Sequence, residues 1–421
     1  GLQLLGSQND MATIRLVLDG VRAYAILIVM GFHLWQQSWL QNLIPHDLLQ
    51  PFGVQDFSLT WVPRTGYMFV DVLLLLSGFC LFLPYARQMA DPLAREPDAP
   101  GLFFRKRAAR ILPSYYFCLL VSLLFLVRPA QYARFGDYLL DLFAHLTCTH
   151  TLWPQSYIGS KFPGVLWTLS VEVQFYLIFP LLARLFRRFP LQCWAVLSAL
   201  AQLYIALFAR TSGGGADPLH INQLPAMLGV YANGMLAAIV WCRLHSARRT
   251  LPARTPLAAT LLCAVSFAAI VCMLHDGLDR AAAIQRWQVD YRFLFSAFIS
   301  VFILSLGLSY RAVQWLFANR AAGFIALISY NLYIWHTTIL LQCKAWHLPP
   351  YPDAPADAYA WPQSANGAPW HFAWQVQYTV LFWVASLVVA ALATCLIEKP
   401  AAKWLLRRRR KRKDAKAVRP A

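Results

Sequence analysis

Ten apolar runs, each long enough to cross a lipid bilayer, recur along this chain of 421 residues. A membrane-spanning helix needs about 20 mostly apolar residues, because it rises about 1.5 Å per residue through a hydrocarbon core of roughly 30 Å. The composition agrees, since 59% of the residues are hydrophobic and only 13% are charged. A soluble protein carries nearly twice that charged fraction. The sequence therefore predicts an all-α, polytopic membrane protein with about ten transmembrane helices.

The predicted spans are Val21–Leu40, Tyr67–Tyr85, Leu112–Val127, Leu166–Leu185, Leu191–Phe208, Leu224–Trp241, Leu257–Leu274, Phe293–Leu308, Phe324–Leu341 and Val376–Ile397. A further amphipathic stretch, Tyr138–His150, is too polar for a span. We expect it to be interfacial or re-entrant.

The basic residues alternate across these spans. Of the 37 Lys and Arg residues, 28 fall in the loops and ends on one side, and the aromatic-rich loops on the other side hold the rest. Because cytoplasmic loops carry the excess of positive charge, both termini are predicted to be cytoplasmic, in a plasma membrane of the bacterial inner-membrane type. The same rule explains the net charge of +18 without a nucleic-acid partner.

The nine cysteines are scattered and form no CxxC motif. Most lie in apolar runs, so they are predicted to be free core thiols. We expect no metal site.

Arg22 and His33 stand out in the first apolar run, eleven positions apart. At 100° per residue both side chains fall on nearly the same helix face, separated by roughly 16 Å along the axis. Ionisable groups inside a membrane are costly and mark a functional site by default. A neutral histidine there could take a proton from an alcohol, and Arg22 could pair with Asp19 or hold an anionic ligand. The alternative is a satisfied core histidine with an interfacial arginine.

A basic cluster begins the third predicted span, with Arg105, Lys106, Arg107 and Arg110, followed by Tyr115. Guanidinium groups bind phosphate through two parallel hydrogen bonds, so the cluster suits a phosphorylated ligand. An equally good interpretation is a basic flank that contacts anionic lipid.

Three further segments carry polar side chains within apolar surroundings. Glu172, near the start of the fourth span, is predicted to orient His33 or to act as the base itself; the alternative is a structural Glu–Arg pair. The supporting residues that we expect near such a site are Asp71, Ser77, Ser170, Tyr176, Ser329, Tyr333 and His336. Ser329, Tyr333 and His336 share one helix face, and Ser77 with Gly78 would allow close helix packing.

In this order, these pieces resemble the acyltransferase 3 family of integral membrane O-acyltransferases. The spacing of Arg22 and His33 resembles the hallmark of that family, and the blocks around Asp71, Arg105–Tyr116, Trp167–Tyr176 and Ser329–His336 resemble its other recurrent segments. The resemblance divides the chain into a cytoplasmic segment over residues 1–17, a membrane acyltransferase domain over residues 18–403 and a basic cytoplasmic tail over residues 404–421. Part of the first segment is expected to be foreign to the native chain, whose expected start is Met11.

The resemblance implies that an acyl group, most often acetyl, moves from cytoplasmic acyl-CoA to a hydroxyl of a surface glycan or lipid-linked saccharide. His33, Glu172 and Arg22 would then be the catalytic residues, with His33 either a general base, which we favour, or a transient acyl carrier. The residues implied in acyl-CoA binding are Arg105, Lys106, Arg107, Arg110 and Tyr115. Acyl-CoA would be a co-substrate, with no permanently bound cofactor, and membrane lipids would be the surrounding partner.

The competing hypothesis is a proton-coupled transporter or flippase that uses Arg22, His33, Asp71 and Glu172 as a proton relay. Such transporters often contain inverted repeats and helices broken at the membrane midplane. The sequence has no such symmetry, and the basic cluster suits a phosphorylated donor better.

Overall fold

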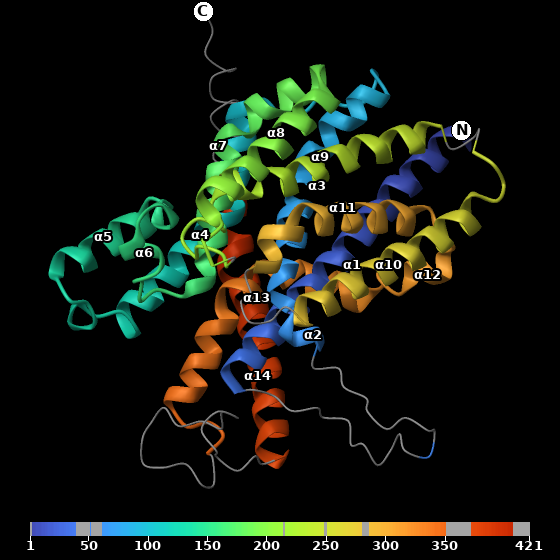
Figure 1. The fold of residues 1–421 in the computed structure, drawn as a ribbon. Helices are drawn as coiled ribbons and strands as arrows, with labels where there is room; N and C mark the ends of the chain where they lie inside the picture. The colour runs from blue at the N-terminus through green and yellow to red at the C-terminus, as the bar shows by residue number, and fades with distance from the viewer. Residues whose placement is uncertain are drawn as a thin grey trace, which may run out of the picture.

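A computed structural model describes residues 2–38, 51, 61–213, 215–247, 251–279, 286–350 and 372–406. Apart from an isolated bridge between Arg210 and Ala216, the regular structure in these residues is helical. The long helices are α1 (Leu2–Ser38), α3 (Phe69–Ala90), α4 (Pro100–Phe125), α7 (Trp167–Arg188), α8 (Pro190–Tyr204), α9 (Leu224–Ser246), α10 (Thr255–Asp279), α11 (Arg286–Leu308), α13 (Arg320–Ala345) and α14 (Phe372–Ala393). They pack into the bundle drawn in Figure 1, which confirms the all-α prediction.

Nine helices within the described ranges are long and apolar enough to cross a membrane. They correspond to nine of the ten predicted spans. The tenth, Val21–Leu40, falls in α1, which carries charged residues in its N-terminal half and is not among the nine; residues 39 and 40 lie outside the described residues. The chain is therefore a multi-pass membrane protein.

Shorter elements extend these helices or connect them. The α-helical ones are α2 (Trp61–Arg64), α5 (Phe135–Leu146), α6 (Pro154–Tyr157) and α12 (Arg311–Trp315). The 3₁₀ turns are η3 (Gly66–Met68), η4 (Pro129–Gln131), η5 (His150–Leu152) and η6 (Gly164–Leu166), and π-helical turns end two spans as η7 (Ile205–Ala209) and η10 (Thr394–Glu398).

Proline marks where several helices begin. Pro100, Pro190 and Pro225 occupy the first turns of α4, α8 and α9, where a missing N–H costs nothing. Pro84, Pro113 and Pro180 instead lie inside α3, α4 and α7. Interior prolines are tolerated in transmembrane helices because neighbouring groups satisfy the freed carbonyls.

The predicted amphipathic stretch Tyr138–His150 overlaps helix α5, which lies beside the bundle with α6 (Figure 1). Its 12 residues are too short to cross a bilayer. Phe135, Leu139 and Phe143 form an exposed apolar stripe, while Asp141 and His145 are buried on the opposite side. A short helix with one apolar face outside the bundle is typical of the membrane interface, so the structure favours the interfacial alternative.

Helices α3 and α9 approach each other most closely at glycines. A Cβ on Gly78 would lie 2.7 Å from the carbonyl oxygen of Tyr231, and a Cβ on Gly234 would overlap the carbonyl oxygen of Leu75. Small residues that let two backbones approach are the usual basis of helix packing in lipid. The predicted packing role of Gly78 is confirmed.

We expect Gly234→Ala to destabilise the protein by about 1–3 kcal/mol, because the added methyl group meets backbone that cannot move independently. The matched control is Gly31→Ala in α1, where nothing lies within 4 Å of an added Cβ. Thermal unfolding in lipid nanodiscs would compare the two variants. Equal midpoints would contradict the close α3–α9 contact as a determinant of stability.

Candidate active site

Three cavities follow one another along the facing sides of α1 and α3. The first, of 230 Å³, is called here the arginine cavity and is lined by Arg15, Leu18, Asp19, Arg22, Cys80, Leu83, Pro84 and Arg87. The second, the middle cavity of 140 Å³, includes Arg22, Val70, Ser77, Arg107, Arg110, Glu172, Tyr176, Ser329 and Tyr333. The third, the histidine cavity of 760 Å³, includes His33, Gln36, Tyr67, Asp71, Trp167, Asn222, Gln288 and Tyr333.

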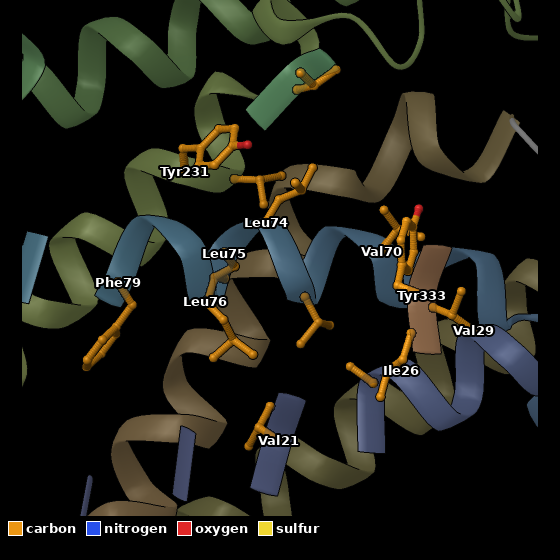
Figure 2. Packing of buried hydrophobic residues seen from close by; sticks show 14 of the residues in the cluster. Val21, Ile26, Val29, Val70, Leu74, Leu75, Leu76, Phe79, Tyr231 and Tyr333 are labelled. Carbon is orange, nitrogen blue, oxygen red and sulfur yellow. The ribbon is translucent and has the colours of Figure 1, made fainter. Parts of the chain in front are cut away.

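Neighbouring cavities share wall residues. Arg22 and Cys80 line both the arginine cavity and the middle cavity. Val70 of α3 and Tyr333 of α13 line both the middle cavity and the histidine cavity. Figure 2 shows these two side chains beside one another, close to Ile26 and Val29 of α1. The cavities thus form one series, in which Arg22 and Cys80 lie at the first boundary and Val70 and Tyr333 at the second.

The face of α1 explains why Arg22 and His33 belong to the same series. Arg15, Arg22, Ile26 and His33 all line its cavities, at spacings of seven, four and seven residues. These spacings keep the side chains on one side of a helix. The prediction that Arg22 and His33 share a face is therefore confirmed.

Arg22 has two partners. Its guanidinium lies 3.2 Å from Oδ1 of Asp19, which is one of the two alternatives considered from the sequence, and 3.7 Å from Sγ of Cys80. The pair is partly open to solvent, because the Asp19 side chain is 42% exposed. Arg22 can therefore exchange this partner for an anionic ligand at modest cost.

Glu172 does not pair with His33, so the prediction that Glu172 orients this histidine is wrong. Among the described residues it lies beside Ser77, with Arg110, Arg107 and Arg22 nearby in the middle cavity. His33 lies in the next cavity, beyond Val70 and Tyr333. Glu172 and His33 share no cavity, because helix rotation turns Glu172 toward the basic side. The placement agrees with the alternative of a Glu–Arg grouping, and Tyr176 shares that cavity as expected.

The predicted basic cluster divides between two roles. Arg107 and Arg110 are three residues apart on α4 and both line the middle cavity. Arg105 points to another side of the helix and donates to the carbonyl oxygen of Leu405, 2.9 Å from its Nε. Lys106 forms an ion pair of 2.5 Å with Asp98.

Tyr115 differs from its predicted place at the donor site. It is fully buried and donates a hydrogen bond of 2.6 Å to the carbonyl oxygen of His145. It therefore ties α4 to α5. Together with Arg105 and Lys106, it lines none of the three cavities. Of the residues implied in acyl-CoA binding, Arg107 and Arg110 are the two that line one of these cavities.

His33 contacts a second histidine from a distant part of the chain. Its Nδ1 lies 3.0 Å from Nε2 of His336 on α13 and 3.0 Å from the carbonyl oxygen of Val29. The two rings are 4.9 Å apart between centroids and tilted by 59°. His336 is fully buried, whereas His33 is partly exposed to its cavity. The polar stripe predicted on α13 thus faces the bundle interior.

Asp71 pairs with an arginine that the sequence analysis placed in the outer loops. Nε of Arg292 on α11 lies 2.9 Å from Oδ2 of Asp71, and both side chains are 1% exposed. Arg292 also donates to the carbonyl oxygen of Ile221 and, over 3.1 Å, to Oδ1 of Asn222. The sequence contained a sign that Arg292 could be buried, because this residue directly precedes the predicted span Phe293–Leu308.

The remaining supporting residues separate into two groups. Ser77, Ser329 and Tyr333 line the middle cavity as predicted, although the hydroxyl of Ser329 is engaged with the carbonyl oxygen of Ala326 at 2.8 Å. Ser170 lines none of the three cavities. It donates to the carbonyl oxygen of Cys148 over 2.9 Å and holds the start of α7 to the preceding loop.

Known protein families include one that matches most of this chain. The acyltransferase domain model of the acyltransferase 3 family matches residues 15–399. Acyltransferase MdmB of Streptomyces mycarofaciens is 29% identical over 197 residues, which are 46% of each chain. A putative O-acetyltransferase of Staphylococcus aureus (strain COL) is 22% identical over 347 residues, 77% of this chain and 50% of that protein.

Nodulation protein 10 of Rhizobium leguminosarum bv. viciae is 26% identical over 241 residues, 53% of this chain and 60% of that protein. The chain thus spans about half the length of the curated relatives that it matches first. No solved structure matches it.

The fold and the site define a multi-pass membrane protein with a series of polar cavities between its helices. The family match covers most of the chain, and the protein belongs to the acyltransferase 3 family.

Proposed function

We propose that this protein is a membrane O-acyltransferase that moves an acetyl group from cytoplasmic acetyl-CoA to a hydroxyl of a saccharide on the other side of the membrane. The acceptor would be a cell-surface glycan or its lipid-linked precursor. The observation that carries the proposal is the series of cavities, with arginines at one end and His33 at the other.

The arginine end suits the phosphates of the donor. Arg15, Arg22 and Arg87 line the arginine cavity, and Arg107 and Arg110 follow in the middle cavity. Guanidinium groups form short, charge-assisted hydrogen bonds with phosphate oxygens. The thin pantetheine arm would extend from there toward His33, which lies roughly 16 Å from Arg22 along α1.

The histidine cavity suits the acceptor. It combines the aromatic rings of Tyr67 and Trp167 with the amides of Asn222 and Gln288. Aromatic faces and a few polar groups that fix orientation are typical of small-molecule sites.

In the proposed reaction, Nε2 of His33 accepts the proton of the acceptor hydroxyl while its oxygen attacks the thioester carbonyl carbon. The tetrahedral intermediate collapses as the carbon–sulfur bond breaks and its electron pair leaves on sulfur. The imidazolium returns the proton to the thiolate. The products are the acetyl ester and coenzyme A with a free thiol.

The proposal is tested with the protein in liposomes, acetyl-CoA labelled in the acetyl group, and a panel of saccharides on the opposite side. We expect labelled ester on the acceptor and one free thiol for each ester formed. Transport of intact donor or acceptor without thioester cleavage would instead support the transporter alternative.

Loss of the arginines in the middle cavity should weaken donor binding. We expect Arg107→Gln combined with Arg110→Gln to raise the Kd for acetyl-CoA at least about tenfold, since a charge-assisted hydrogen bond contributes about 1.5–3 kcal/mol. Isothermal titration in nanodiscs measures this change. Arg95→Gln is the control, because that side chain is 86% exposed and lines none of the three cavities. Equal affinities would return the cluster to a lipid-contacting flank.

A further inference from the structure

We propose that His336 is a positioning residue that fixes the tautomer of His33, so that the hydrogen sits on Nδ1 and Nε2 is the basic atom. The catalytic meaning of this inference rests on the proposed function. The tautomer itself can be measured without any activity.

The argument begins with the hydrogen on His336. Its Nδ1 lies 3.0 Å from the carbonyl oxygen of Leu332 and 2.7 Å from that of Tyr333. Carbonyl oxygens only accept hydrogen bonds, so this nitrogen carries a hydrogen. The ring is fully buried, and no carboxylate contacts it within the described part of the chain. A buried charge without a partner is costly, so the ring is neutral and its Nε2 accepts.

The accepting Nε2 of His336 determines which nitrogen of the His33 ring carries the hydrogen. Nε2 of His336 lies 3.0 Å from Nδ1 of His33, which must therefore donate. The carbonyl oxygen of Val29 lies 3.0 Å from the same Nδ1 and can only accept, so it also requires a hydrogen on this nitrogen. Both contacts place the single hydrogen of neutral His33 on Nδ1. The lone pair then belongs to Nε2, which has no hydrogen-bond partner among the described residues.

The arrangement performs the task for which Glu172 was predicted. In histidine–carboxylate pairs, the carboxylate holds the imidazole in one tautomer and stabilises the imidazolium that forms. Here a neutral imidazole takes the place of the carboxylate. It adds no second ionised group to the apolar interior, where unpaired charge is costly. When Nε2 of His33 takes a proton, its Nδ1–H still donates to His336 and Val29.

Two substitutions distinguish a positioning role of His336 from a general contribution of this residue to the fold. In His336→Gln, the side-chain carbonyl can still accept from Nδ1 of His33, whereas in His336→Leu only the backbone carbonyl oxygen of Val29 remains as an acceptor. We expect the leucine variant to lose about 100-fold or more in kcat, with the KM for acetyl-CoA within about twofold of the original. The glutamine variant should stay within about tenfold of the original kcat. Equal losses in both variants would overturn the positioning role.

A spectroscopic measurement decides the tautomer directly. The ring nitrogens of the ¹⁵N-histidine-labelled protein in lipid are observed by solid-state NMR, and the signals of His33 are assigned by their absence in His33→Asn. We expect a protonated Nδ1 and an unprotonated Nε2 in the unmodified protein, and a share of the opposite tautomer in His336→Leu. A hydrogen on Nε2 in the unmodified protein would overturn the inference whatever the activity. The expected tautomer in a protein without transferase activity would uphold the inference and refute the proposed function.

Discussion

Replacing His33 with alanine is expected to lower acetyl transfer by about 10²–10⁴-fold, the range that a positioned general base contributes. The physical reason is that the variant keeps the histidine cavity but loses the atom that takes the hydroxyl proton. The measurement is the rate of labelled ester formation in liposomes at saturating acetyl-CoA.

Donor affinity provides the control for this variant. His33 lies in a different cavity from Arg107 and Arg110, so the Kd for acetyl-CoA should change less than about threefold. The matched variant is Gln37→Ala, which removes a polar side chain from the same cavity wall and should leave kcat within about tenfold. Undiminished transfer by His33→Ala would remove the basis of the proposed chemistry.

Replacing Arg292 with methionine is expected to destabilise the fold by about 3–5 kcal/mol. The substitution leaves the carboxylate of Asp71 buried without its counter-ion, and removing one partner of a buried pair usually costs that much. Asp71 and Arg292 also join α3 to α11, so the loss weakens a contact between spans. Thermal unfolding in nanodiscs, followed by tryptophan fluorescence, measures the change.

Two further variants make this prediction specific. The double substitution Asp71→Leu with Arg292→Met removes both charges and should be more stable than Arg292→Met alone. Arg210→Met breaks a more exposed pair with Asp290, in which the arginine side chain is 47% exposed, and should cost about 0–1 kcal/mol. If Arg210→Met and Arg292→Met unfold alike, the buried pair does not hold the helices together.

Much of the fold could be predicted from the sequence, because span length and apolar composition are local properties. Within the described residues, each predicted span overlaps a long helix, and the amphipathic stretch overlaps the short helix α5. The ends were less accurate. Residues 100–111 continue α4 well before the predicted start at Leu112, since charged side chains beyond the apolar run still favour helix.

The site could be predicted one helix at a time. Spacing along α1 placed Arg22 and His33 on one face because that is a property of a single helix. The same rule separates Arg107 and Arg110, three residues apart, from Arg105, which lies about 200° around the helix from Arg107. Helical geometry could therefore have identified which members of the basic cluster face the cavity.

Contacts between helices could not be predicted from the sequence. His33 and His336 are 303 residues apart, and Asp71 and Arg292 are 221 apart. Their pairing depends on which helices neighbour each other and on how each is rotated. The predicted partner of His33 was therefore wrong, although the required kind of partner, a buried polar side chain from another helix, was correct.

The boundary between the middle cavity and the histidine cavity, at Val70 and Tyr333, has a bioenergetic consequence. Many membranes store energy as an ion gradient, and a continuous file of water through a membrane protein would discharge such a gradient. The side chains that line both the middle cavity and the histidine cavity are the isopropyl group of Val70 and the phenol of Tyr333, both less than 10% exposed. The isopropyl group offers water no hydrogen bond and the phenol offers only its hydroxyl, so this boundary is a poor path for a chain of water molecules. In the proposed reaction the pantetheine arm with its acetyl thioester would pass Val70 and Tyr333 by brief side-chain motion, and the membrane would remain electrically insulated between turnovers.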